Sequence, residues 1–166
     1  MITYTINFDP VCKFTNEQLY QVCRKNPEIK FERNARGEIV IMSPTGGKNW
    51  KSKCWNYDWI RNLESPNQLG TLFDSSTCFR LPNGGGGDRS PEVAWIRQER
   101  WDTLTPEQKQ KIPPIAPNFV LELMSPTDNL KVAPDKMKEY MNSQVKLGWL
   151  IKPKLATWKI IASEKP

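Results

Sequence analysis

Two short apolar segments, each containing one acidic residue, constrain the fold of this chain more than any other feature. Glu92 lies in residues 91–96 (PEVAWI), and Glu122 lies in residues 119–124 (FVLELM). Neither segment has a polar side when its residues alternate, which is typical of strands that are covered on both faces. A carboxylate buried in such a strand costs several kcal/mol unless a cation or a hydrogen-bond donor compensates it. We therefore expect both carboxylates to have partners brought from elsewhere in the chain.

A simpler interpretation of the same pattern is that each Glu faces water, as charged residues on edge strands do. The alternation of side chains along each segment favours burial of the Glu residues over exposure to water. Along the first segment Glu92 shares a face with Ala94 and Ile96, and the opposite face is also apolar.

Length and composition indicate one domain, residues 1–166, with enough apolar content (38%) for a core. The longest apolar runs, such as residues 117–124, are far shorter than the roughly 20 residues that cross a bilayer. The N-terminal segment also lacks the pattern of a secretory signal. We expect a cytoplasmic protein.

The absence of histidine excludes several kinds of chemistry. With no His in the chain, Ser-His-Asp and Cys-His catalysis and His-ligated zinc are ruled out. The four cysteines form no Cys-x-x-Cys unit and are too sparse for a disulfide scaffold, so we expect reduced thiols. A bound metal should therefore be hard and oxygen-ligated, such as magnesium, manganese or calcium.

The charge distribution is compatible with a polyanionic partner. The chain has 24 Lys and Arg residues against 18 Asp and Glu residues, a net charge of +6. Lys48, Lys51 and Lys53 lie in a segment interleaved with tryptophans, a mixture suited to phosphate contact and base stacking. The alternative is that these aromatic residues recur at helical spacing and form the buried face of a basic helix.

Local patterns predict mixed secondary structure. Two glycine-rich tracts, residues 46–49 and 84–87, lack the pattern of a phosphate-binding loop and are predicted to be turns or loops. The predicted helices are residues 15–26, a tryptophan-rich helix ending near 65–67, residues 106–111 capped by Thr105, and residues 134–142. The predicted strands include a hairpin, residues 29–32 and 38–42, and the two acidic segments. The other predicted strands are residues 69–74, 77–81, 146–151 and 156–161.

These elements predict an α/β or α+β domain in which a central mixed sheet is flanked by helices, with Glu92 and Glu122 on adjacent strands. The helix after Glu122 carries Lys136 and Lys138, and carboxylates that hold a divalent metal beside a lysine are typical of hydrolases. Helical geometry cannot choose between the lysines, because they flank the apolar stripe of Met137 and Tyr140 on opposite sides.

This constellation resembles the PD-(D/E)XK superfamily of nucleases, which have the restriction-endonuclease-like fold. Longer stretches in the same order resemble the Uma-type restriction endonuclease family, over roughly residues 28–161, with residues 1–27 as an N-terminal helical segment. These stretches are residues 42–47, 75–83, 88–95, 121–128, 136–140 and 147–151.

The resemblance implies roles for individual residues. Glu92, Glu122 and the backbone carbonyl of Leu123 would hold Mg2+ or Mn2+. Lys136 would be the catalytic lysine, because Met124 occupies the position that the superfamily usually gives to lysine. Glu32 would be an additional acid at the site. A surface Glu beside Arg33 explains that residue equally well.

The function implied by the resemblance is a magnesium-dependent endonuclease that hydrolyses phosphodiester bonds of DNA, and many nucleases of this type act as homodimers. Three departures from the family pattern bear on activity: Glu92 replaces the usual Asp, Gln144 a common Gly, and Lys152 a common Asp. The longer side chain at position 92 moves the carboxylate by about 1.5 Å. The alternatives are a catalytically inactive protein of this fold that binds nucleic acid or another partner, and a structural subunit with no affinity for nucleic acid.

Overall fold

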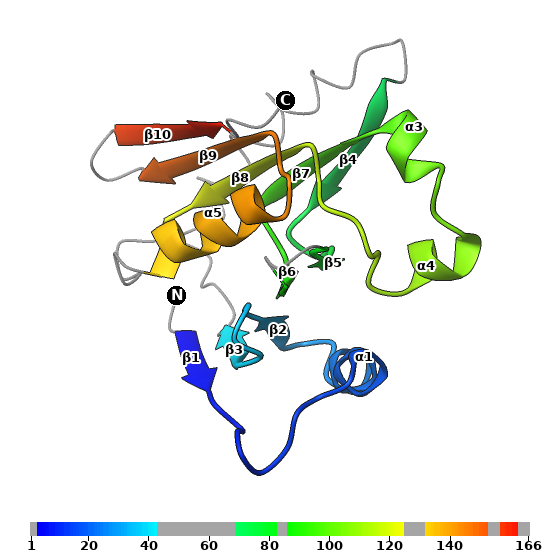
Figure 1. The fold of residues 1–166 in the computed structure, drawn as a ribbon, viewed down its shortest axis with the longest axis vertical. Coiled ribbons are helices and arrows are strands. Elements are labelled where there is room, and N and C mark those ends of the chain that lie inside the picture. Colours follow the sequence, from blue (N-terminus) through cyan, green and yellow to red (C-terminus); the bar gives the residue numbers. More distant parts are fainter. Residues whose placement is uncertain (1–2, 43–68, 83–85, 125–131, 153–156, 163–166) are drawn as a thin grey trace.

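Over the residues that it describes, the computed structural model contains two β-sheets, a helix that lies against one of them, and three further helices (Figure 1). The structure describes residues 3–42, 69–82, 86–124, 132–152 and 157–162. The predicted tryptophan-rich helix, with Lys48, Lys51 and Lys53, falls outside these residues.

The larger mixed sheet contains both acidic segments. β7 and β8 are adjacent inner strands, as predicted, and they run antiparallel. β8 and β9 run parallel, with α5 between them in the sequence, and the remaining pairs are antiparallel. In spatial order the strands are β10 (Thr157–Ala162), β9 (Leu147–Lys152), β8 (Phe119–Leu123), β7 (Val93–Arg97) and β4 (Gly70–Asp74).

The second sheet is wholly antiparallel and is built around the predicted hairpin. Its turn contains Gly37, whose φ of 83° lies in the left-handed region that glycine tolerates. The strand order is β1 (Thr3–Ile6), β3 (Ile39–Met42), β2 (Lys30–Arg33), β6 (Asp88–Arg89) and β5 (Phe79–Arg80). The α+β class is confirmed, but the strands form two sheets where one was expected.

The sequence did not predict β1 or β6, for different physical reasons. β1 is an exposed edge strand, with Tyr4 60% exposed, so no buried apolar face marks it in the sequence. β6 consists of Asp88 and Arg89, two charged residues that are buried through ion pairs. A hydrophobic pattern cannot reveal either strand.

Two of the helices begin where their N-terminal signals predicted. α1 (Asn16–Lys25) and α4 (Pro106–Gln110) begin with capping boxes, in which Thr15 pairs with Gln18 and Thr105 with Gln108. α5 (Val132–Asn142) starts two residues earlier than expected, and the short α3 (Gln98–Trp101) was not predicted. No helix in the described part of the chain is long and apolar enough to cross a membrane.

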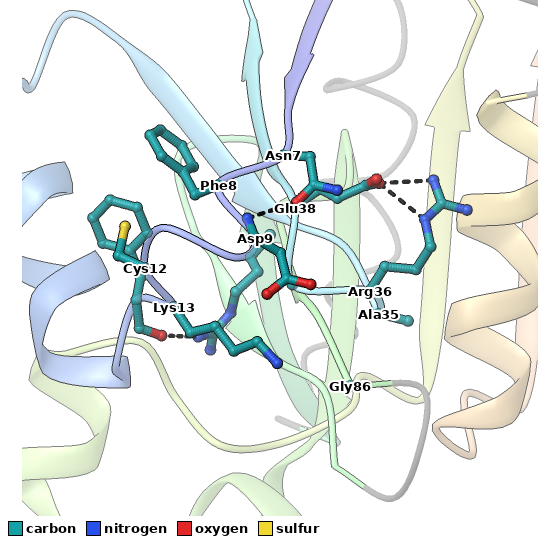
Figure 2. A pocket seen from close by; sticks show the side chains of 12 residues that line it. Asn7, Phe8, Asp9, Cys12, Lys13, Ala35, Arg36, Glu38 and Gly86 are labelled. Carbon is teal, nitrogen blue, oxygen red and sulfur yellow. Dashed lines mark hydrogen bonds and ion pairs between the residues drawn. The ribbon is translucent and has the colours of Figure 1, made fainter.

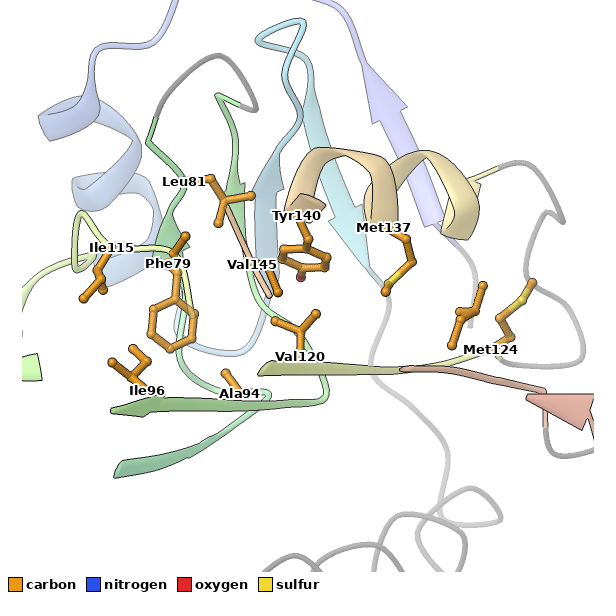
Figure 3. Close-up of a cluster of buried hydrophobic side chains, with 12 residues drawn as sticks. Phe79, Leu81, Ala94, Ile96, Ile115, Val120, Met124, Met137, Tyr140 and Val145 are labelled. Carbon is orange, nitrogen blue, oxygen red and sulfur yellow. The ribbon is translucent and has the colours of Figure 1, made fainter. Parts of the chain in front are cut away.

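The main core lies between α5 and the mixed sheet and extends to β5. Figure 3 shows Met137 and Tyr140 reaching from α5 toward Val120 on β8. Phe79, which is fully buried, brings β5 of the second sheet into the same cluster. The other buried members are Leu81, Ala94, Ile96, Ile115, Ala116, Met124, Val145 and Leu150.

The turn after α5 places a non-glycine residue in an unfavourable backbone region. Gln144 has a φ of 71°, and among the described residues it is the single non-glycine with positive φ. It lies between Ser143 and Val145, whose N–H groups donate to carbonyl oxygens in the last turn of α5. Glycine is the residue most often found at such a helix C-terminus.

Gln144→Gly should therefore raise the free energy of unfolding by about 1 kcal/mol, because it relieves the left-handed strain of a residue with a Cβ. Urea denaturation of the variant and the parent measures the difference. Gln144→Ala is the matched control, since it shortens the side chain but keeps the Cβ. An equal gain from both substitutions would contradict this explanation.

Candidate active site

The strand register brings the two predicted acidic segments side by side. Val93, the first residue of β7, pairs with Leu121, the residue before Glu122 on β8. Glu122 lies within β8 and is buried, whereas Glu92 immediately precedes β7 and is only partly buried. Glu122 thus lies on an inner strand, as expected, whereas Glu92 lies in the bend just before the adjacent strand and not on the strand itself.

Lys136 on α5 lies between two buried carboxylates. Its Nζ is 2.7 Å from Oε1 of Glu122 and donates to Oε1 of Glu32 at 2.8 Å and to the carbonyl oxygen of Ser90 at 3.2 Å. Lys138, whose side chain is 74% exposed, instead pairs with Asp135 on the same helix. The structure therefore brings Lys136 to the carboxylates and leaves Lys138 at the surface.

Glu32 is an interior residue, which overturns the surface interpretation. Its side chain is 2% exposed and accepts from Nη1 of Arg89 at 2.9 Å and from the backbone N–H of Ser90 at 2.9 Å. Arg33, the neighbour that the surface interpretation invoked, pairs with Asp88 instead. Glu32 thus belongs to the same ionic cluster as Lys136.

Three further residues complete this cluster, and sequence reasoning missed each of them as a site residue. The Tyr140 hydroxyl donates to Oε1 of Glu122 at 2.8 Å. Arg89 joins Glu32 to Glu139, with Nε 2.7 Å from the Glu139 carboxylate. Lys30 donates to the carbonyl oxygen of Ser90 at 3.2 Å. One signal was available for Lys30, because it is two residues from Glu32 on the same strand and so shares its face.

The pKa values of the cluster follow from burial and from the surrounding charges. Burial alone would raise the pKa of Glu32, but Lys136, Arg89 and Lys30 outweigh it and lower the pKa to about 2. Burial raises the pKa of Glu122, with Lys136 opposing the shift. Burial would lower the pKa of Lys136, yet Glu122 and Glu32 raise it to about 12.

Lys30 responds differently from Lys136. Burial lowers the pKa of Lys30; Glu32 opposes this shift, while the Lys136 ammonium adds to it. The two lysines therefore repel one another inside a cluster whose carboxylates attract both.

The donor set near Glu122 suits a hard divalent cation. Glu92, Glu122 and the Leu123 carbonyl offer oxygen atoms, as Mg2+ and Mn2+ prefer. Lys136 and Tyr140 both contact Oε1 of Glu122, so a cation would bind through the other oxygen. Within the described residues, no group of three or more His, Cys, Asp or Glu side chains is arranged to hold a metal. The backbone carbonyl is therefore a necessary part of this proposed ligand set.

A pocket of about 490 Å³ lies elsewhere, beside the β2–β3 hairpin (Figure 2). Arg33 lines it, and because Arg33 follows Glu32 on β2 it faces away from the ionic cluster. Figure 2 shows Lys13, Asp9 and Arg36 around the opening. None of the predicted catalytic residues lines this pocket.

Comparison with solved structures defines the class of fold. A crystal structure from Anabaena variabilis, described as a "putative nuclease belonging to DUF820", superposes with a TM-score of 0.64 at 18% identity, over 82% of this chain and 73% of that chain. The fold is therefore restriction-endonuclease-like, as predicted. The model of the Uma2 family, described as "Putative restriction endonuclease", matches residues 16–164, and the chain belongs to this family. No curated protein matches the chain.

The depressed pKa of Glu32 gives a pH-dependent prediction. Its folded-state pKa of about 2 lies below the ordinary value of 4.5, so its ionic contacts stabilise the fold above pH 4.5, and this contribution is lost as the pH falls toward 2. Glu32→Gln should lower the free energy of unfolding by roughly 3 kcal/mol at pH 7 and by progressively less below pH 4.5.

Urea denaturation of Glu32→Gln and the parent at several pH values between 7 and 3 tests this prediction. Glu107→Gln is the control, because that side chain is 77% exposed, and its effect should stay within about 0.5 kcal/mol. A loss for Glu32→Gln that does not change with pH would show that the charge of Glu32 is not what stabilises the fold.

Proposed function

We propose that this protein is a metal-dependent DNA endonuclease that hydrolyses phosphodiester bonds. One observation carries the proposal: the Lys136 ammonium is held beside Glu122, on a strand that pairs with the strand Glu92 immediately precedes. Carboxylates on adjacent strands with a lysine beside them are the groups that metal-assisted phosphodiester hydrolysis requires. Membership of the Uma2 family supports the same reaction class.

Glu92, Glu122 and the backbone carbonyl of Leu123 would hold Mg2+ or Mn2+. When bound, the ion polarises the scissile phosphate and lowers the pKa of a water molecule. The pairing of Val93 with Leu121 brings the segment that carries Glu92 alongside the strand that carries Glu122. Tyr140 keeps Glu122 in place by donating to Oε1.

Lys136 would stabilise the negative charge that develops on the phosphoryl oxygens during attack. Its nitrogen donates to Glu32 and to the Ser90 carbonyl and forms an ion pair with Glu122, contacts that suit the protonated ammonium. A protonated lysine stabilises charge and cannot accept a proton from water, so the contacts favour this role over that of a general base. Glu32, held by Arg89, is the positioning residue for Lys136.

DNA is the proposed substrate. The net charge of +6 favours a polyanion, and Lys48, Lys51 and Lys53 are the proposed contacts to the phosphate backbone. Cutting both strands of a duplex requires two active sites, which a homodimer would supply.

A catalytically inactive protein of the same fold that binds nucleic acid or another partner is the second candidate. Two features favour it: the longer Glu92 side chain at a position that is usually Asp, and the engagement of Glu122 by both Lys136 and Tyr140.

Nicking of supercoiled plasmid in the presence of Mg2+ or Mn2+ is the direct test. We expect the parent to nick the plasmid only with metal, and Glu122→Gln and Lys136→Met to be slower by at least about 10²-fold, because each loses a charged group at the reacting phosphate. Lys138→Met removes the same charge from the exposed side of α5 and should retain the parental rate. No nicking by the parent would favour the inactive candidate.

Glu92→Asp tests whether side-chain length limits activity. Shortening the side chain by one methylene would retract the carboxylate by about 1.5 Å to the usual position, and we expect nicking to become about tenfold faster. Initial rates at saturating Mg2+ provide the comparison. A slower variant would show that this site is built around Glu.

A further inference from the structure

We propose that Lys30 is a second cationic catalytic residue, one that contacts the phosphodiester of the substrate beside Lys136. This inference rests on the proposed function, which gives roles to the metal ligands and to Lys136 but none to Lys30. Its evidence is the place of Lys30 on β2, its hydrogen bonding, and the arrangement of charges around it.

The strand places Lys30 in the cluster. Lys30 and Glu32 are two residues apart on β2, so both side chains lie on the face that carries the ionic cluster. The carbonyl oxygen of Ser90 accepts from Nζ of Lys30 and from Nζ of Lys136, each at 3.2 Å. The two ammonium groups therefore share one acceptor.

Hydrogen bonding distinguishes the two lysines. Lys136 already donates to Glu32 and Ser90 and forms an ion pair with Glu122, so it is more fully engaged than Lys30. Within the described part of the chain, the side chain of Lys30 makes one hydrogen bond, to Ser90. Lys30 can thus donate to an incoming phosphate oxygen without losing that bond.

Exposure places Lys30 on the outer side of the cluster. Lys136, Glu32 and Glu122 are buried, whereas Lys30 is only partly buried and follows the exposed Ile29. Glu92 is also partly buried. Lys30 is therefore the less buried of the two lysines.

The cluster holds Lys30 and Lys136 close to the same carboxylates. Against the effect of burial, each of the two ammonium groups acts to lower the pKa of Glu32 and of Glu122, so Lys30 shares the compensation of these charges with Lys136. Lys30 adds an ammonium close to that of Lys136, and like charges in a partly buried site disfavour one another. A phosphodiester anion between the two nitrogens would turn this repulsion into attraction.

The test compares Lys30→Met and Lys30→Arg with the parent, and Lys138→Met serves as the control for loss of a positive charge. Plasmid nicking with Mg2+ measures catalysis. Binding of a fluorescently labelled DNA duplex without metal, followed by anisotropy over a range of salt concentrations, measures phosphate contact independently of activity. Urea denaturation reports whether each variant is folded.

We expect Lys30→Met to reduce the nicking rate by about 10²-fold and the slope of log affinity against log salt by about 0.9, which corresponds to one lost phosphate contact. Lys30→Arg should keep the parental slope, and Lys138→Met should keep both the slope and the rate. Lys30→Met should remain folded, with a urea midpoint somewhat below that of the parent, because Lys30 also helps to stabilise the ionised Glu32.

If folded Lys30→Met has the parental nicking rate and the parental salt slope, the proposal is overturned. A lower urea midpoint in that case would show that Lys30 has a structural role. If the parent does not nick plasmid, the proposed function fails, and a smaller slope for Lys30→Met would still support the phosphate contact. If the parent does not bind the duplex even at low salt, both proposals are overturned.

Discussion

A single buried ammonium connects the three parts of this fold. The Nζ of Lys136, on α5, contacts Glu122 of the mixed sheet and Glu32 of the second sheet, at 2.7 Å and 2.8 Å. Removing one partner from such a network would leave an uncompensated charge in the interior, which is among the most destabilising changes in a protein. The same contacts that join the sheets therefore also define the candidate active site.

The apolar core and the ionic cluster occupy successive positions on the same elements. On β8, Val120 packs in the core and Glu122, two residues later on the same face, enters the cluster. On α5, Met137 packs against the sheet, whereas Tyr140 does both, with its ring in the core and its hydroxyl on Glu122. Close packing of α5 thus holds Lys136 in place, and this is how a small domain can position charged groups without water around them.

Local signals in the sequence predicted much of the fold. The capping boxes of α1 and α4, the hairpin of β2 and β3 and the two inner strands follow from short patterns that depend on neighbouring residues alone. The family resemblance singled out Lys136, which helical geometry alone could not distinguish from Lys138. Arg89 and Lys30 were missed because their partners are 57 and 60 residues away in the sequence, and no periodicity connects them. The second sheet escaped prediction for a related reason, since buried ion pairs hold its strand β6 where apolar residues would have been recognisable.

The connection from β8 through α5 to the parallel strand β9 has a consequence for how the cluster assembles. Glu122 and Tyr140 are 18 residues apart and lie within this one unit, so their contact closes a short loop of chain. Glu32 is 104 residues from Lys136, and that contact closes a much longer loop, which costs more chain entropy. On this basis α5 would pack on the mixed sheet first. The β2–β3 hairpin, which carries Glu32, would reach Lys136 afterwards. The chemistry of the site would then become available only when the last long-range contact of the domain has formed.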